Sequence, residues 1–401
     1  MASTYLQSSL DASPQNVALG PSNQGQPNTT VRVLHVINGE HYAGAERVQD
    51  LLAMRLPDWG FDIGFVCLKP GRFRQARKSR QAPIYDLPMR SKFDLQVVRS
   101  LANLIGAEGY SLVHTHTPRS LLVGRPAAAL AKVPVVHHIH GQTDTEVHRK
   151  LGSRFNAWVE RRSLAGAARV IAVSESARDY ASAQSISDAK LRLVPNGIPA
   201  RSSLRVRPTP SGVWTLGTVA LFRPRKGLEV LLEALAMLRD SGRQVRLQAV
   251  GPFETPAYER EAKQACNRLG LDSVVKWRGF RKDIDAELAR MDLFVFPSVL
   301  AEGLPMVLLE AMAAGVPIVG SRVDGVVDAL GNGRCGLLAE PNNPADLAEK
   351  VASFIRGEAD WATLRTTAAA WQAERFSDHS MAAGVAGVYR EALTAWGALS
   401  R

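Results

Sequence analysis

Two glutamates, Glu302 and Glu310, have seven residues between them and stand where the sequence predicts that a strand gives way to a helix. The apolar run 293–296 is typical of a buried strand. Pro305 fits the first position of a helix, where a backbone N–H has no partner to lose, and Gly315 ends the helix formers that follow. The pattern therefore predicts one acid at the carboxyl end of a strand and a second on the next helix, beside a helix N-terminus that favours anions.

Glu310 is the less ordinary of the two acids, because its sequence neighbours are apolar: Leu308, Leu309, Ala311 and Met312. A solvated surface acid is the simpler interpretation, since glutamates at this spacing are common. Burial of a carboxylate without partners is costly, however, so an acid within an apolar stretch indicates a binding or catalytic role.

Three cations gather in a second loop of the same kind. Arg223, Arg225 and Lys226 follow a predicted strand at 214–220 and precede a predicted helix with leucines along one face. Guanidinium and ammonium groups beside helix amides suit a diphosphate. A basic surface loop is the alternative, and the residues alone leave the two interpretations about equal.

The segment from Glu302 to Pro317, EGLPMVLLEAMAAGVP, resembles the signature of the group 1 glycosyltransferases (glycosyltransferase family 4). Further motifs of that family recur in the same order from about Val31 onward, at 43–46 (AGAE), 191–198 (LRLVPNGI) and 221–227 (LFRPRKG). The resemblance implies the two-domain GT-B architecture, a nucleotide-sugar donor, and transfer that retains the anomeric configuration.

The resemblance also implies roles for single residues. Glu302 and His140 would be the catalytic residues, both in contact with the donor sugar. Glu310 would bond the donor ribose, and Lys226 its pyrophosphate. We expect no general base, because in this family the leaving phosphate is thought to take the acceptor proton; catalysis would then be positioning and electrostatics.

Two departures from the family motifs affect the donor site. Leu221 stands at the position of the family arginine, and we expect Arg223 to replace that arginine. Ala43 replaces one glycine of the first loop, where Gly44 would face the donor pyrophosphate. The resemblance further implies donor contacts from Gly251, Phe280, Gly303, Leu304, Met306 and Val307, with Phe280 at the nucleobase.

Five of the nine histidines are close in sequence, at 114, 116, 137, 138 and 140. A metal site is one interpretation, but no two of them are four apart on a predicted helix and no cysteine is nearby. Histidines near strand ends are mostly structural. His140 is the exception that we expect to bind a ligand, because it ends a predicted strand just before Gly141, where α/β folds place ligand contacts.

The length of 401 residues suits two domains, each with its own core. Predicted strands and helices alternate in two series with a Pro-, Ser- and Arg-rich segment between them. We expect a disordered leader at 1–30, an acceptor-side Rossmann-like domain at 31–200, a linker at 201–212, a nucleotide-sugar-binding Rossmann-like domain at 213–375, and a helix at 376–401 that crosses back to the first domain. The predicted fold class is α/β, with two doubly wound domains facing a cleft.

No metal and no other cofactor is expected. Asp283-Ile284-Asp285 matches the D-x-D metal motif of the other glycosyltransferase fold, but it begins a predicted helix, where acids are favoured anyway. The three cysteines are far apart and form no metal-ligand spacing, which suits a reduced cytoplasm. The first 30 residues lack the basic start and apolar core of a signal peptide, and no apolar run reaches the length of a membrane span.

The net charge of +11 allows nucleic acid, an anionic membrane or acidic ligands as partners. Basic residues cluster at 69–92 and at 148–162. A solvated basic face is the simpler interpretation of each cluster, and contact with anionic lipid or an anionic glycan is the functional one. Nucleic acid is not expected, because aromatic residues do not interleave with the clusters. We expect a cytoplasmic protein that contacts the inner face of the cytoplasmic membrane.

The predicted function is a retaining, hexosyltransferase-like glycosyltransferase. It would move a sugar from a nucleotide sugar to a glycan or lipid-linked acceptor, in polysaccharide, lipopolysaccharide or glycolipid biosynthesis. A nucleotide-sugar epimerase or a phosphorylase shares the architecture; the first needs acid and base residues at the sugar and no acceptor. A basic scaffold without enzymatic activity is the third alternative, and it predicts salt-sensitive binding of membrane or nucleic acid without turnover.

Overall fold

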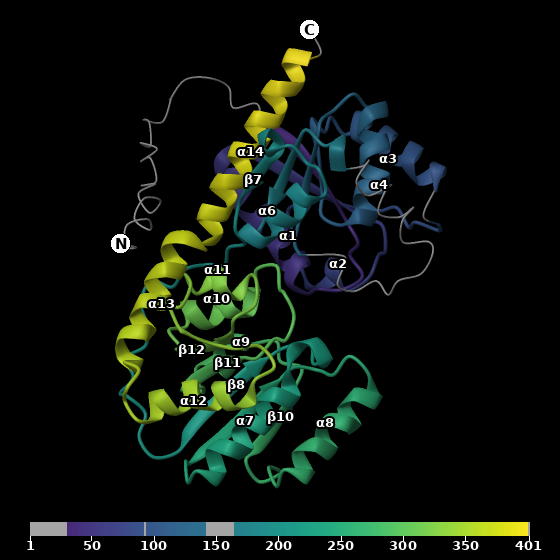
Figure 1. Cartoon of the computed structure of the whole chain (residues 1–401). Coiled ribbons are helices and arrows are strands. Elements are labelled where there is room, and N and C mark those ends of the chain that lie inside the picture. The colour runs from purple at the N-terminus through teal and green to yellow at the C-terminus, as the bar shows by residue number, and fades with distance from the viewer. Residues whose placement is uncertain (1–29, 92–93, 142–163, 400–401) are drawn as a thin grey trace, which may run out of the picture.

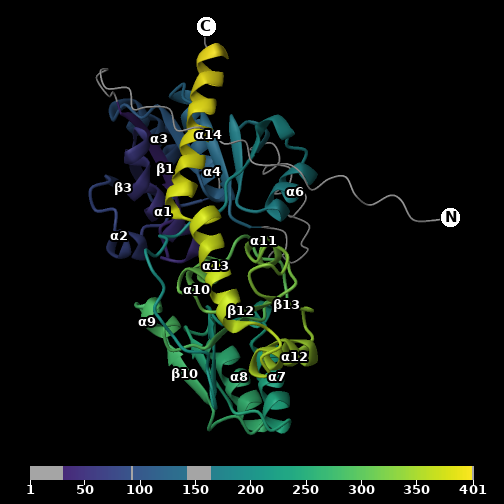
Figure 2. The ribbon, with the colours of Figure 1, turned by 90° about the vertical axis from the view of Figure 1, so that its left-hand side faces the viewer.

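The computed structural model describes residues 30–91, 94–141 and 164–399. They form two lobes, each built on a parallel sheet (Figure 1). The helices α13 (Trp361–Arg375) and α14 (Asp378–Leu399) run along one side of both lobes (Figures 1 and 2). The two-domain Rossmann-like fold expected from the sequence is confirmed.

The first lobe holds a 7-stranded sheet in the order β3-β2-β1-β4-β5-β6-β7. Its central strands are buried along most of their length, as expected when helices cover both faces of a parallel sheet. The strands are β1 (Val31–Ile37), β2 (Phe61–Cys67), β3 (Ile84–Asp86), β4 (Leu112–Thr115), β5 (Val135–Ile139), β6 (Arg169–Ala172) and β7 (Leu191–Leu193). The described helices are α1 (Gly44–Arg55), η1 (Leu56–Trp59), α2 (Arg72–Ala76), α3 (Leu95–Ala107), α4 (Pro118–Leu130), α6 (Glu175–Ala183) and η2 (Asp188–Lys190).

The second lobe holds a 6-stranded sheet in the order β10-β9-β8-β11-β12-β13. Its strands are β8 (Trp214–Val219), β9 (Val245–Val250), β10 (Val275–Gly279), β11 (Leu293–Phe296), β12 (Ile318–Ser321) and β13 (Leu337–Ala339). Its helices are η3 (Pro224–Lys226), α7 (Leu228–Asp240), α8 (Pro256–Arg268), α9 (Ile284–Leu288), α10 (Met306–Ala313), α11 (Val326–Ala329) and α12 (Pro344–Ile355).

The strand order reverses once in each sheet, between β1 and β4 and between β8 and β11. In open parallel sheets, ligands bind outside the carboxyl ends of the strands at such a reversal. The loops that follow β8 and β11 are therefore the part of the second lobe where a ligand site is expected.

The chain returns to the first lobe through α14, which packs against α1, β5 and β6. Asp378 at its start accepts a hydrogen bond of 2.7 Å from Arg55 Nε of α1. The segment 199–212 between the two sheets forms neither helix nor strand, and it is tied to the second lobe. Arg207 bonds Asp292 at 2.7 Å, and Arg201 bonds Asp285 at 2.5 Å.

Local capping signals placed several helices correctly. Helix α12 begins after Asn343, whose side chain accepts from the Asp346 amide, and it ends at Ile355 as expected. Ser174 likewise caps α6. The expectation for Pro305 was wrong by one position: Pro305 is the N-cap, with a β-region ψ of 116°, and α10 begins at Met306.

The helix expected from Ser91 begins only at Leu95, because the Asp94 side chain caps it by accepting from the Val97 amide. The helix expected at 154–164 lies outside the described residues except for Leu164. Within the described ranges, no helix is both long and apolar enough to cross a lipid bilayer.

Candidate active site

Glu302 and Lys226 meet at the reversal between β8 and β11. Lys226 ends η3 after β8, Glu302 follows β11, and Lys226 Nζ lies 2.7 Å from Glu302 Oε1. Ser298 Oγ donates to the same carboxylate oxygen at 2.6 Å. Burial lowers the pKa of Lys226, and the Glu302 carboxylate opposes that shift. Two residues predicted for the donor site, 76 positions apart in sequence, thus form one largely buried ion pair.

The two arginines of the same loop point to different acids. Arg225 Nη2 donates to the Ala301 carbonyl at 2.7 Å and lies 3.9 Å from Glu302 Oε2. Arg223 instead lies 3.6 Å from Glu254. The structure therefore puts Arg225 beside Glu302, although Arg223 was the residue expected to replace the family arginine. The sequence could not tell which of the two arginines lies beside Glu302. Both follow the same strand, and only the direction of each side chain distinguishes them.

Gly303 joins the site loop of the second lobe to the first lobe. A Cβ on Gly303 would lie 1.8 Å from the carbonyl oxygen of His140, so only glycine permits this approach. The predicted catalytic pair, Glu302 and His140, are therefore held on adjoining backbones, although they come from different lobes. The next residue, Leu304, is buried, and its carbonyl accepts from Asn196 Nδ2 at 3.1 Å.

Glu310 is also paired across the lobes. It lies on α10 with a side chain only 10% exposed, and Arg47 of α1 donates to its Oε1. Glu310 Oε2 is buried and has no hydrogen-bond partner among the described residues. Arg47 was not predicted as a site residue, although it directly follows the predicted motif at 43–46. The acid expected to bind the donor ribose therefore has one oxygen held by a cation and one unused.

The start of α10 faces the first loop of the first lobe. A Cβ on Gly44 would lie 3.8 Å from Met306 Cγ, so these two predicted donor contacts are neighbours. Met306 is buried and Val307 is partly buried. Their amides precede the first bonds of the helix, which Leu308 and Leu309 donate to the Pro305 carbonyl.

The two remaining predicted contacts follow other strands of the second sheet. Gly251 comes directly after β9 with φ of +129°, and a Cβ there would lie 1.8 Å from the Ala220 carbonyl oxygen. Phe280 comes directly after β10 and is 68% exposed. Both therefore lie at the carboxyl edge of the sheet, but Phe280 is on the surface and not in the buried cluster around Glu302.

The two acids of the D-x-D sequence have structural partners. Asp283 caps α9 by accepting from the Ala286 amide at 2.9 Å, and Asp285 pairs with Arg201. The helix that the sequence predicted at this point is present.

His140 follows β5 with a largely buried ring. Its Nε2 lies 3.1 Å from His116 Nδ1, and burial lowers the pKa of His140 to about 4. His140 is therefore a neutral imidazole near neutral pH, able to donate one hydrogen bond and to accept another.

Comparison with known proteins agrees with this geometry. The family described as "Glycosyl transferases group 1" matches residues 213–356, and "Glycosyltransferase Family 4" matches residues 42–201. The putative glycosyltransferase EpsF of Bacillus subtilis is 31% identical over 319 residues, which are 74% of this chain and 81% of EpsF. The chain belongs to the group 1 glycosyltransferases of family 4.

A further relative of this glycosyltransferase is named for its donor and its acceptor. The Escherichia coli UDP-Gal:alpha-D-GlcNAc-diphosphoundecaprenol alpha-1,3-galactosyltransferase is 26% identical over 79% of this chain and 86% of its own length. Among solved structures, Anabaena HepE in complex with UDP superposes with a TM-score of 0.79 at 23% identity, covering 90% of this chain and 99% of HepE. This structural likeness supports the GT-B fold.

Proposed function

We propose that this glycosyltransferase moves a sugar from a UDP-sugar to a lipid-linked glycan acceptor, with retention of the anomeric configuration. The Glu302–Lys226 pair at the strand reversal is the observation that carries the proposal. UDP is favoured as the nucleotide because HepE was solved with UDP and the E. coli relative is named for UDP-Gal. The lipid-linked acceptor is favoured by that relative, whose named acceptor is a diphosphoundecaprenol.

In this reaction the leaving diphosphate lies by Lys226, Arg225 and the first amides of α10. These groups stabilise the negative charge that develops as the glycosidic bond to the diphosphate breaks. Glu302 accepts hydrogen bonds from donor-sugar hydroxyls, His140 contacts the same sugar, and Glu310 binds the ribose. The departing phosphate takes the acceptor proton. Because the cations are part of the chain, no metal ion is required.

Contact with a membrane surface would bring the enzyme to such an acceptor. The first basic cluster is less exposed than its sequence suggests, because Arg77 is buried and Arg74 pairs with Asp86. The second cluster lies outside the described residues. Co-sedimentation with phosphatidylglycerol vesicles, compared with phosphatidylcholine vesicles, tests the contact, and equal recovery with both would refute an electrostatic contribution.

A thermal-shift panel of UDP-, GDP- and ADP-sugars in the presence of a chelator tests the donor proposal. A ligand that binds the native state raises the unfolding midpoint by mass action. We expect UDP-sugars to raise the midpoint of the wild type and to raise that of Glu310→Gln much less. UDP release with an added lipid-linked acceptor then tests turnover. Absence of any shift, with salt-sensitive binding to vesicles, would favour the scaffold alternative.

A further inference from the structure

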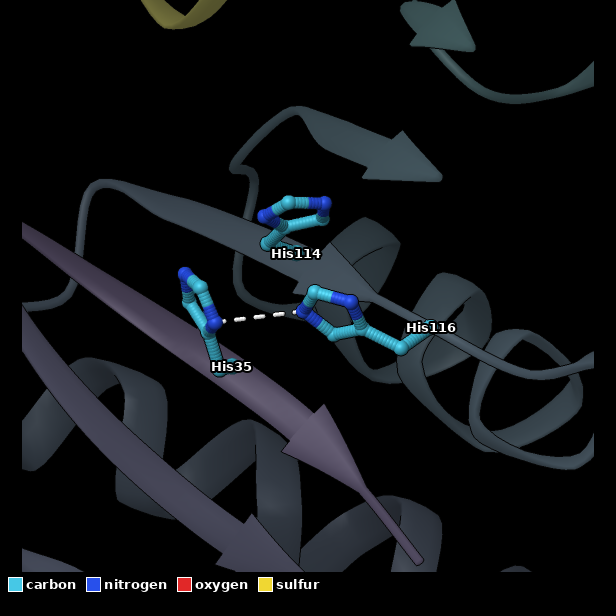
Figure 3. A group of neighbouring side chains, drawn as sticks. All are labelled: His35, His114 and His116. Carbon is cyan, nitrogen blue, oxygen red and sulfur yellow. Dashed lines mark hydrogen bonds between the residues drawn. The ribbon is translucent and has the colours of Figure 1, made fainter. Parts of the chain in front are cut away.

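A row of imidazoles lies on the face of the first sheet that α14 covers. His35 comes from β1, His114 and His116 from β4 and its end, and His138 and His140 from β5 and its end. Side chains alternate along a strand, so residues two apart share a face, and β1, β4 and β5 are adjacent. His137 points to the opposite face, where it bonds Thr115. Figure 3 shows His35, His114 and His116 with their rings turned toward one another.

Four of these imidazoles and one tyrosine form a continuous chain of contacts. Tyr389 of α14 places its hydroxyl 2.6 Å from His114 Nδ1 and 2.8 Å from His35 Nε2. His35 Nδ1 lies 3.1 Å from His116 Nε2 (the dashed line in Figure 3), and His116 Nδ1 lies 3.1 Å from His140 Nε2. All four distances are hydrogen-bond distances. The chain therefore runs from the buried core at His114 to His140, which lies beside Gly303.

Every member of the chain is uncharged at neutral pH. Burial lowers the pKa of His35 to about 3 and of His140 to about 4, and it lowers the pKa of His114 and His116 well below the ordinary value. Burial raises the pKa of the Tyr389 hydroxyl. Each imidazole therefore carries one N–H and one lone pair, and Tyr389 carries one O–H.

Neutral groups in such a chain must all donate in the same direction. If His140 Nε2 accepts from His116 Nδ1, then His116 Nε2 must accept from His35 Nδ1. In turn, His35 Nε2 accepts from the Tyr389 hydroxyl, and that hydroxyl accepts from His114 Nδ1. All four imidazoles then carry the proton on Nδ1. If the direction reverses, all four carry it on Nε2. The two end atoms, His114 Nε2 and His140 Nδ1, are buried and have no partner among the described residues, so nothing in the described core breaks this symmetry.

We propose that these five groups act as one hydrogen-bonded relay in which the four imidazoles share a single tautomer. Through His35 and His116, Tyr389 then determines which nitrogen of the His140 ring carries the proton while the donor sugar contacts that ring. Tyr389 is a positioning residue for the reaction, and it couples the returning helix α14 to the site. The statement about the sugar rests on the proposed function, whereas the shared tautomer does not.

A transition metal is the competing explanation of the same side chains. One ligand nitrogen from each of His35, His114 and His116 lies within 4.8 Å of the others. The rings of Phe65 and Phe61 pack edge-on against His35 and Tyr389, so a dication here would lie beside apolar groups. Burial of a charge in such surroundings is costly. Metal binding would also replace the bond between His35 and His116, so the relay and the metal exclude each other.

Nitrogen NMR of protein labelled at histidine distinguishes the tautomers, because protonated and unprotonated ring nitrogens resonate far apart. In the wild type we expect His35, His114, His116 and His140 to show the same tautomer. In His114→Leu the Tyr389 O–H keeps only His35 Nε2 as acceptor, so the remaining three imidazoles should all carry the proton on Nδ1. Mixed tautomers in the wild type, or any Nε2–H among the three in His114→Leu, would overturn the relay. Stoichiometric metal in the purified protein would overturn it as well.

Kinetics of Tyr389→Phe supply a second test, because phenylalanine keeps the ring that packs on Phe61 and removes only the hydroxyl. The variant loses the hydrogen bonds of the hydroxyl to His114 and His35. Because these bonds set the direction of the chain that ends at His140, donor turnover is expected to fall about five-fold. UDP alone, which has no sugar, should bind the variant and the wild type equally. Equal turnover by both proteins would refute the influence on the sugar. If the shared tautomer is observed but no nucleotide sugar is turned over by the wild type, the relay stands and the proposed function fails.

Discussion

Mild acid is expected to destabilise this protein, because its buried histidines are held neutral. Burial lowers the pKa of His35 and His137 to about 3 and of His140 to about 4. In the unfolded chain a histidine takes up a proton below about pH 6.5. Since the folded pKa values are depressed, their contribution to stability is complete above pH 6.5 and is lost as the pH falls toward the folded values.

The expected loss is large compared with the stability of a protein. Each pH unit below 6.5 costs about 1.4 kcal/mol per histidine, so these three cost about 4 kcal/mol at pH 5.5. The pKa values of His114, His116 and His138 are also lowered by burial, so they add to the loss in the same direction. Total unfolding free energies are about 5–15 kcal/mol, so the loss removes a substantial share.

Thermal unfolding between about pH 7.5 and pH 5.5 measures this loss, because most carboxylates titrate below about pH 5. We expect the midpoint to fall by about 10 °C or more across this range. The matched variants are His138→Leu, which removes a fully buried ring whose nitrogens lack partners among the described residues, and His41→Gln at the exposed His41. His138→Leu should reduce the pH dependence and His41→Gln should not. A midpoint that is the same at both pH values would refute the reasoning.

Three further substitutions test the site. Arg225→Ala should lower donor turnover about 100-fold by removing a cation from the leaving group, whereas Arg223→Ala should change it only a few-fold; the reverse order in steady-state kinetics would restore the interpretation that Arg223 replaces the family arginine. Arg47→Ala should lower stability by about 1–3 kcal/mol, because a buried carboxylate loses its partner; urea unfolding measures this, and an unchanged midpoint would mean that the ion pair is immaterial. Gly303→Ala should abolish turnover and lower the melting temperature, because the added Cβ has no room. Gly387→Ala, in an open part of α14, should be neutral or stabilising. Equal melting temperatures of the two variants would contradict the close approach of the lobes.

The parts of the structure that local sequence determines were predictable. Asn343 and Pro344 set the start of α12, since a cap and a first-turn proline act within a few residues. Glu302, Lys226 and Glu310 were selected as site residues because they lie in motifs of the family. Pro305 was predicted as the first residue of α10 but is its N-cap, because a proline has a φ that suits both positions.

Contacts between distant segments were not predictable in the same way. Arg47 and Glu310 are 263 positions apart, and His35 and Tyr389 are 354 positions apart. No periodicity along one element records such a pair, because each depends on how α1, α10 and α14 pack. His35 was missed for a further reason: as the only histidine of β1, it gains meaning only when β4 is placed next to it.

The two acids of the site share a property that bears on the order of events in transfer. Glu302 is paired with Lys226 and Glu310 with Arg47, so each acid already has a cation before any donor is present. A diphosphate competes for Lys226 because it carries more negative charge than one carboxylate. As Lys226 turns to the diphosphate, Glu302 needs new donors for its buried oxygens, and sugar hydroxyls supply them. In the proposed reaction, therefore, binding of the diphosphate prepares Glu302 for the sugar, and a nucleotide without a diphosphate should leave Glu302 paired with Lys226.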